Sequence, residues 1–153
     1  MTEATRGAVT IRLAEFSDAA VLASLMTQLG YETRVAEMEM RLQKILPDSR
    51  YRTRLALVEG KVAGMIGTFC HYSYAHNDPS ARILALVVDG PFRRRGVGRA
   101  LLEMAEADLA GRNVTRLSLD TRLTREGAHS FYEGLGYVKT GFRFGKTLAA
   151  WTD

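Results

Sequence analysis

The sequence has little cysteine and no long apolar run. Its only cysteine, Cys70, has no second cysteine with which to form an intrachain disulfide. No segment approaches the roughly 18 consecutive apolar residues that a membrane-spanning helix needs, and residues 1–7 lack the apolar core of a secretory signal. We therefore expect a soluble cytoplasmic protein in a reducing environment, without a membrane partner.

The net charge of the chain is also small. The formal net charge is +4 over 153 residues, of which 46% are hydrophobic, and this composition fits one compact domain with a sizeable core. Arginines occur throughout the chain and are densest at residues 93–95, so local anion binding explains them better than a nucleic-acid-binding stripe does. We expect residues 1–7 to be a flexible tail, residues 8–153 to form one domain, and neither a metal site nor a nucleic-acid partner.

Hydrophobic periodicity divides the chain into strands and helices. Gly60 and Lys61 are predicted to be the two-residue turn of a hairpin. The predicted strands are Val9–Leu13, Tyr51–Glu59, Val62–Tyr74, Arg82–Val88, Thr115–Asp120, Tyr137–Thr140 and Phe142–Leu148. The predicted helices are Ala19–Leu29 after the N-cap residues Ser17 and Asp18, a second helix opened by Thr33 and ended by Pro47, Val97–Ala110, and Arg125–Leu135.

A basic, glycine-bearing turn lies between the fourth of these strands and the third helix. From residue 92 to 99 it reads Phe-Arg-Arg-Arg-Gly-Val-Gly-Arg. Gly96 and Gly98 allow backbone angles and close approaches that a Cβ would forbid, so successive N–H groups can turn toward an anion at the helix N-terminus. The three arginines add positive charge. The pattern predicts a cradle for the phosphates of a small molecule.

Two other phosphate-binding motifs fit this turn less well. A P-loop needs a lysine followed by Ser or Thr, and this pair follows neither Gly96 nor Gly98. The chain has the order of strand, turn, helix and strand of a dinucleotide-binding motif, with Asp120 in the place of its acidic residue. However, Leu101 occupies the position of the third glycine of that motif. A nicotinamide enzyme is therefore the weaker alternative.

The pattern Arg-x-x-Gly-x-Gly, at Arg93, Gly96 and Gly98, resembles the acyl-CoA pyrophosphate motif of the GCN5-related N-acetyltransferases, the GNAT family. Residues 128–137, Ala-His-Ser-Phe-Tyr-Glu-Gly-Leu-Gly-Tyr, resemble the closing motif of the same family. The resemblance is close over residues 83–148 and extends to the N-terminal half by layout. It implies an α/β fold of one domain, with a central twisted, mixed and mostly antiparallel sheet of about seven strands and about four flanking helices.

The resemblance also implies a reaction. We expect transfer of an acetyl group from acetyl-CoA to a primary amine, directly and within a ternary complex. Tyr132 matches the tyrosine that gives a proton to the departing thiolate. Arg125 stands where family members often carry an asparagine that touches the cofactor, and it is expected to meet a phosphate or solvent instead. The residues expected to bind acetyl-CoA are Leu86, Val87 and Val88 through their backbone, together with Arg93, Arg94, Arg95, Gly96, Val97, Gly98, Arg99 and Arg125.

The general base and the acceptor remain open from the sequence. Candidate bases are Asp120, His71, His76, Glu39 or a chain of water molecules. The acceptor, a small-molecule or peptide amine, is expected in a groove between the first two helices and the loop of residues 71–78. The resemblance also suggests a homodimer through the C-terminal strands. The alternative function is a CoA-binding sensor or scaffold domain that has lost catalysis.

Overall fold

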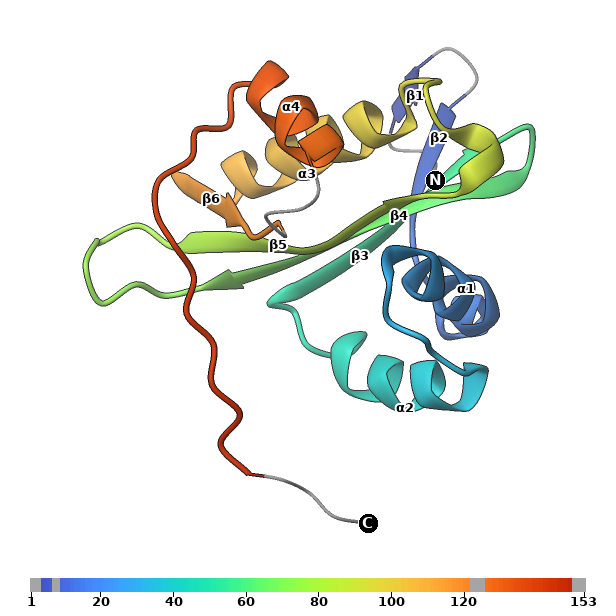
Figure 1. Ribbon diagram of the computed structural model, residues 1–153, viewed down its shortest axis with the longest axis horizontal. Helices are drawn as coiled ribbons and strands as arrows, with labels where there is room; N and C mark the ends of the chain where they lie inside the picture. The colour runs from blue at the N-terminus through green and yellow to red at the C-terminus, as the bar shows by residue number, and fades with distance from the viewer. Residues whose placement is uncertain (1–3, 7–8, 122–125, 150–153) are drawn as a thin grey trace. The chain divides into compact units, whose positions relative to one another are not determined.

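The computed structural model describes residues 4–6, 9–121 and 126–149 (Figure 1). The strands are β1 (Ala4–Arg6), β2 (Val9–Leu13), β3 (Tyr51–Val58), β4 (Lys61–His71), β5 (Ser80–Val88) and β6 (Arg116–Leu119). The helices are α1 (Ala19–Leu29), α2 (Val35–Ile45), α3 (Val97–Gly111) and α4 (Glu126–Gly134), with short 3₁₀ helices η1 (Phe16–Asp18) and η2 (Gly90–Phe92). The chain divides into two compact parts, one ending at Leu119 and the other beginning at Asp120.

The first part is built on one sheet with the strand order β1-β2-β3-β4-β5-β6. All neighbouring strands are antiparallel except β5 and β6, which are parallel and are joined through α3. This is the mixed, mostly antiparallel sheet that the sequence predicts. Ala4–Arg6, which lie inside the expected tail, pair with β2 as its edge strand.

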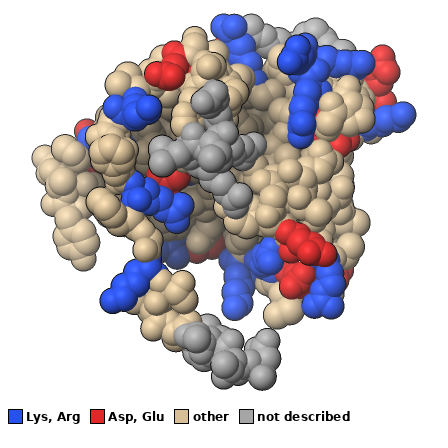
Figure 2. Space-filling model, viewed as in Figure 1, with Lys and Arg blue, Asp and Glu red and all other residues tan. Residues whose placement is uncertain are grey.

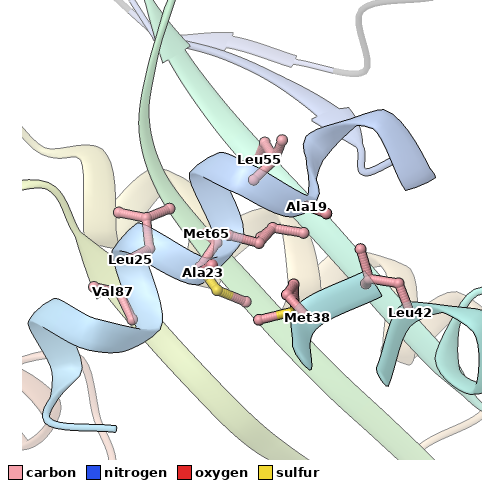
Figure 3. Packing of buried hydrophobic residues seen from close by; sticks show 9 residues of the cluster. Ala19, Ala23, Leu25, Met38, Leu42, Leu55, Met65 and Val87 are labelled. Carbon is pink, nitrogen blue, oxygen red and sulfur yellow. The ribbon is translucent and has the colours of Figure 1, made fainter. Parts of the chain in front are cut away.

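Helices cover both faces of this sheet, α1 and α2 on one side and α3 on the other (Figure 1). Leu55, Met65 and Val87 lie next to one another on β3, β4 and β5 and pack against α1 and α2 (Figure 3). The helix residues of this core are Ala19, Leu22, Ala23, Leu25, Met38 and Leu42. On the opposite side α3 buries its apolar stripe, Val97, Ala100, Leu101, Leu102, Ala105 and Leu109.

The hairpin between β3 and β4 turns one residue earlier than predicted. Its two loop residues are Glu59 and Gly60, with φ values of 52° and 78°. A type I′ turn requires positive φ at both positions, and Gly60 fits its second position. Lys61 therefore begins β4 and pairs with Val58. The strand ends at His71, three residues before the predicted end.

The two predicted C-terminal strands are not formed. Within the described residues 135–149 no strand is present, and Phe142, Phe144 and Leu148 are 87–93% exposed. Alternating apolar residues favour a strand only where a neighbouring strand pairs with the backbone and a core accepts one face. Among the residues that the structure describes, the sheet accordingly has six strands rather than about seven. Across the described part of the chain, no helix has the length and apolar character needed to cross a membrane.

Candidate functional site

Two residues of the glycine turn have a left-handed backbone conformation. After η2, Arg93 is extended, Arg94 has φ 65° and Gly96 has φ 78°. Left-handed residues that alternate with ordinary ones turn successive N–H groups toward one concave side, which is a typical anion-binding arrangement. Gly98 lies in the first turn of α3 and is not among the residues with positive φ. The other left-handed residue of the turn is instead Arg94, a predicted cradle residue whose backbone conformation, unusual for a non-glycine, the sequence did not indicate.

The N-terminus of α3 opens directly onto this turn. Gly96 is the N-cap residue, and no side chain caps the helix there. The N–H of Ala100 bonds to the carbonyl of Gly96 at 3.0 Å, and by helix geometry the N–H groups of residues 97–99 point out of the helix end. The side chain of Val97 is buried in the core, so only its backbone faces the turn. Unsatisfied donors and the helix dipole together favour an anion at this point.

The arginines of the turn are exposed, and they lie in the loop before α3 and in its first turn. Arg93 donates from Nε to the carbonyl oxygen of Val88 at 3.3 Å. The Arg95 guanidinium carbon lies 5.6 Å from the centre of the Phe92 ring. Arg99 forms an ion pair with Glu103, one helical turn later, at 3.2 Å. The predicted cradle residues 93–99 are therefore brought together in one loop and one helix end.

The edge of β5 is open beside this turn. The ladder between β5 and β6 runs only from Ser80–Arg116 to Ile83–Leu119, so no described strand pairs with residues 84–88 on that side. Leu84 is an extra residue opposite β4, because Gly67 pairs with Ala85 and Thr68 with Ile83. Leu86, Val87 and Val88 stay paired to β4 on their other edge. An extended ligand arm can add to such an edge through backbone hydrogen bonds.

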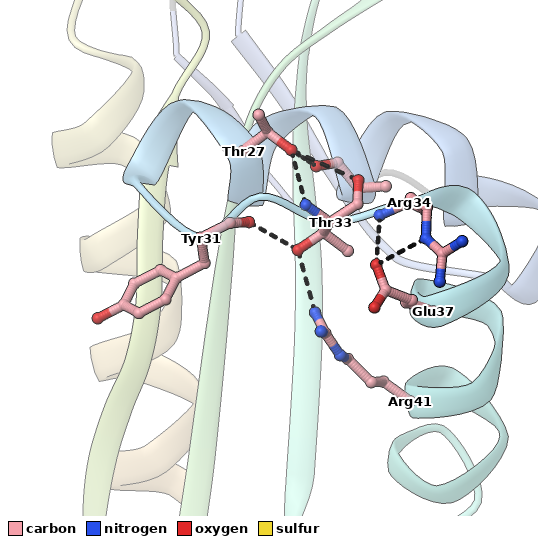
Figure 4. Close-up of polar contacts among 7 residues, drawn as sticks. Thr27, Tyr31, Thr33, Arg34, Glu37 and Arg41 are labelled. Carbon is pink, nitrogen blue, oxygen red and sulfur yellow. Dashed lines mark hydrogen bonds and ion pairs between the residues drawn. The ribbon is translucent and has the colours of Figure 1, made fainter. Parts of the chain in front are cut away.

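The connection between α1 and α2 is tied down by a polar network (Figure 4). Thr33 was predicted to open the second helix, but α2 begins at Val35, and Arg34 occupies the N-cap position with its N–H bonded to Glu37 at 2.9 Å. The buried Thr33 instead receives a hydrogen bond from Arg41, at 3.1 Å, and donates to the carbonyl of Tyr31, at 2.7 Å. This network holds the α1–α2 connection in one conformation. The connection is expected to form one wall of the acceptor groove.

An aromatic row lies on the α1 and α2 side of the sheet, beyond the helical core. The centre of the Phe69 ring lies 4.7 Å from the centre of the Tyr51 ring. Phe69 also stacks on its other neighbour, His71, with the ring centres 5.8 Å apart. Arg50 covers Phe69 at 5.5 Å and forms an ion pair with Asp48 at 2.7 Å. Side-chain and backbone hydrogen bonds from Arg50 lower the pKa of Asp48 to about 2. This surface combines aromatic rings with a few polar groups, both of which are common in small-molecule sites.

The candidate bases are found in different places. His71 ends β4, where its Nδ1 lies 2.9 Å from the carbonyl oxygen of Tyr72. His76 is exposed in the following loop, and Glu39 is half-buried on α2. Asp120 belongs to the second part, where it lies 3.8 Å from Arg143. His71 is the candidate that shares the aromatic face of the sheet.

Tyr132 belongs to the second part of the chain, in the last turns of α4. The helix closes through Gly136, which has φ 92°. The N–H of Tyr137 bonds to the carbonyl of Tyr132 at 3.0 Å, and that of Gly136 bonds to Glu133 at 3.1 Å. This is the Schellman closure, and the edge-to-face contact of Tyr132 with Tyr137 at 5.8 Å is the apolar contact that accompanies it. The Leu-Gly-aromatic motif thus ends the tyrosine helix and packs Tyr137 against Tyr132. Arg125 lies outside the described residues.

Sequence reasoning missed Arg116, at the start of β6. Its guanidinium is held by Ser80 and by the backbone of Asp78, residues 36 and 38 positions away. No local pattern around Arg116 indicates these partners. On the face of the molecule seen in Figure 2, Lys and Arg side chains are interspersed with acidic and uncharged surface.

Known proteins resemble this chain in sequence and in fold. Residues 19–137 match the model of the acetyltransferase (GNAT) family. The aminoalkylphosphonate N-acetyltransferase of Salmonella typhimurium is 39% identical over 105 residues, which are 67% of this chain and 67% of that protein. The [ribosomal protein bS18]-alanine N-acetyltransferase of the same organism is 38% identical over 63 residues, 41% of this chain and 43% of that one.

The fold has close counterparts among solved structures. A GNAT family acetyltransferase from Staphylococcus aureus superimposes with a TM-score of 0.79 at 29% identity, over 92% of this chain and 99% of that one. The family match covers well over half of the chain and includes both the glycine turn and the tyrosine helix. The chain therefore belongs to the GNAT family of acetyltransferases and is an acetyl-CoA-dependent N-acetyltransferase.

Proposed function

We propose that the protein transfers an acetyl group from acetyl-CoA directly to the primary amine of a small acceptor, with both substrates bound at once. The observation that carries this proposal is the position of the glycine turn beside the open edge of β5. The turn offers backbone donors for a pyrophosphate, and the edge offers backbone groups for an extended amide-containing arm. Acetyl-CoA has both parts, and it supplies an activated thioester.

The backbone of the turn has the main binding role in this proposal. The N–H groups from Arg94 to Arg99 hold the pyrophosphate, and the arginine side chains add charge. Gly96 fits this role because a side chain is absent at the N-cap and its φ is positive. Along residues 84–88 of β5, one backbone N–H polarises the thioester carbonyl, where negative charge develops as the amine attacks.

Tyr132 is proposed as the general acid. A tyrosine hydroxyl carries a proton that it can give to a departing thiolate. The role is supported by the match of residues 128–137 to the closing motif and by the Schellman closure that orients the ring. No covalent enzyme intermediate is needed.

The acceptor class is suggested by the relatives. One of them is named for aminoalkylphosphonates, and another for the alanine of ribosomal protein bS18. The first name points to a small amine with an anionic group and the second to a protein amine. The longer of the two alignments belongs to the small-molecule enzyme, so we propose a small acceptor.

Calorimetric titration with acetyl-CoA and, separately, with NADH tests the binding part of the proposal. Micromolar binding of acetyl-CoA alone is expected. Absence of acetyl-CoA binding would overturn the proposal, and binding of NADH in its place would favour a dehydrogenase-like protein.

Replacement of Tyr132 by Phe tests the catalytic part. The variant is expected to lose on the order of 10²-fold in kcat while it keeps its affinity for acetyl-CoA and its thermal unfolding midpoint. A CoA-binding sensor without catalysis would show no turnover in either protein, and unchanged kcat in the variant would remove Tyr132 from the mechanism.

A further inference from the structure

A groove crosses the middle of the sheet on the α1 and α2 side. Residues that pair directly across neighbouring strands share a face. Thr53 pairs with Gly67, and Gly67 pairs with Ala85. All three are only half-buried, although they lie on the adjacent strands β3, β4 and β5 of a six-stranded sheet. We name this row of Thr53, Gly67 and Ala85 the central groove.

Larger side chains border the central groove on both sides. One border is the helical core, where Leu55, Met65 and Val87 pair in the same order across the strands (Figure 3). The other border is the aromatic row, where Tyr51 pairs with Phe69. The ring contacts of Phe69 described above hold this border in place. The groove therefore has an aliphatic wall and an aromatic wall.

Neither the backbone nor the packing of the chain requires the glycine in the middle of this groove. Gly67 is not among the residues with positive φ, and the extra residue of the nearby bulge, Leu84, lies in β5. Apart from the chain neighbours of Gly67, the only described atom within 4 Å of an added Cβ is Met65 Cε, at 3.8 Å. A glycine inside a strand costs stability and often marks a place that a ligand approaches closely.

The central groove leads from the open edge of β5 to a pocket beside α2. Ala85 belongs to residues 84–88, which no described strand pairs on their outer edge and where we place the thioester. At the other end, Thr53 and Tyr51 line a pocket together with Ile45 and Leu46. Neighbouring strands lie about 4.8 Å apart, so Thr53 is about 10 Å from Ala85 across the sheet. An amine whose nitrogen lies near Ala85 can extend its stem over Gly67 toward this pocket.

The walls of the groove favour an apolar stem. The residues named above as its floor and walls are aliphatic, aromatic or small, and none of them carries a carboxylate. Arg82, which pairs with Phe69, adds a positive charge to the aromatic row. A second ammonium group on the stem would lose its hydration here without gaining a carboxylate partner from these residues.

We propose that Gly67 determines the acceptor specificity of the enzyme, and that the central groove takes the stem of a primary monoamine whose stem is slim, unbranched and apolar. This inference rests on the proposed acetyl transfer and names the acceptor class for it. It selects monoamines over polyamines, and small amines over a protein amino terminus, whose peptide backbone and first side chain branch next to the nitrogen.

Acceptor discrimination by the wild-type enzyme is the first test. Initial rates are measured with ethylamine, n-pentylamine, 1,5-diaminopentane and a peptide that begins with alanine. n-Pentylamine and the diamine have the same stem and differ in the second ammonium group. We expect kcat/KM for n-pentylamine to exceed the values for the diamine and for ethylamine by about 10-fold or more.

An added side chain at position 67 is the second test. Gly67→Leu is expected to raise the Michaelis constant of n-pentylamine about 10-fold or more. The constant for ethylamine should change much less, because its two-carbon stem ends before position 67. Gly67→Ala, whose Cβ makes only an ordinary contact, should give a smaller change in the same direction and provides the test if the Leu variant does not fold. Gly111→Leu, an equal addition in open space at the end of α3, should behave as wild type.

Thermal unfolding and calorimetry with acetyl-CoA accompany the rate measurements, and Gly67→Ala is expected to keep the acetyl-CoA Kd. Equal losses toward ethylamine and n-pentylamine, no effect of either change at position 67, or a wild-type preference for the diamine or the peptide would overturn the role of Gly67. Failure of acetyl-CoA to bind, or turnover of no amine at all, would instead overturn the underlying transferase proposal.

Discussion

The side chain of Gln28 joins the end of α1 to the loop that precedes the glycine turn. Its Nε2 donates to Oδ1 of Asp89 at 2.6 Å, and its Oε1 accepts the N–H of Gly90 at 3.2 Å. Asp89 follows β5, and Gly90 begins η2. Helix α1, which is expected to border the acceptor groove, is thereby bonded to the loop that leads into the proposed pyrophosphate cradle.

We expect Gln28→Ala to loosen this loop. Loss of two hydrogen bonds should lower the free energy of unfolding by about 1 kcal/mol and raise the Kd of acetyl-CoA several-fold, measured by urea denaturation and calorimetry. Gln43→Ala, an equivalent change at an exposed position of α2, should alter neither. Equal affinities in the two variants would show that the loop does not depend on Gln28.

Gly96→Ala should weaken acetyl-CoA binding. Nothing lies within 4 Å of the position of an added Cβ, so the cost comes from the φ of 78° and is about 1–2 kcal/mol for an L-residue. Relief of that strain would reorient the N–H groups of the turn. Gly111→Ala, at the end of the same helix and also in open space, should be neutral or slightly stabilising. Comparable acetyl-CoA Kd values for both variants would argue against a backbone cradle.

Gly64→Ala should destabilise the protein more than Gly67→Ala on the same strand. A Cβ on Gly64 would lie 2.7 Å from the carbonyl oxygen of Val87 and 3.3 Å from both Leu101 Cδ1 and Val97 Cγ1. Because a backbone oxygen in the sheet cannot move aside, we expect a loss of about 1–3 kcal/mol. The nearest atom to a Cβ on Gly67 lies at 3.8 Å, an ordinary contact. Thermal unfolding of the two variants gives the comparison.

The ion pair of Asp18 with Arg12 should make stability depend on pH. Both carboxylate oxygens accept hydrogen bonds from the guanidinium at 2.9 Å, which lowers the pKa of Asp18 below the ordinary 3.8. A lowered pKa in the folded state means that the stabilisation is complete above pH 3.8 and is lost as the pH falls through the folded value.

We therefore expect Asp18→Asn to cost about 1 kcal/mol at pH 6 and less at pH 3, by urea denaturation at both values. Glu32→Gln, at an exposed position, serves as the control for loss of a carboxylate. A penalty that stays constant between the two pH values would mean that the carboxylate charge of Asp18 does not stabilise the fold.

Several elements could be predicted because their signals are local. The helix Ala19–Leu29 coincides with α1, and the predicted start of α3 at Val97 is confirmed, since apolar spacing and a flanking glycine lie within a few residues of each boundary. Asp18 was predicted as a helix cap and does occupy the N-cap position, but its carboxylate bonds to Arg12 and to the N–H of Glu15 instead. The competing partner comes from a neighbouring strand, which no local pattern indicates.

The two strands predicted from Tyr137 onward show where a local pattern is not sufficient. Their apolar residues alternate as a buried strand requires, yet Phe142 and Phe144 are exposed and the described residues around them form no ladder. A strand forms only when a neighbouring strand pairs with it. An alternating pattern of apolar residues therefore favours a strand, but other segments decide whether the strand forms. The homodimer expected through this segment stays a prediction.

The sequence by itself determined the glycine turn, the helix behind it and the family, because backbone angles at Gly96 and exposed N–H groups at a helix end depend on adjacent residues. Only the tertiary structure decided the partners of Gln28 and Arg116, which lie 61 and 36 positions away in Asp89 and Ser80. Hydrogen bonds between side chains act over about 3 Å in space, and which distant residues come within that distance depends on how the sheet and helices pack.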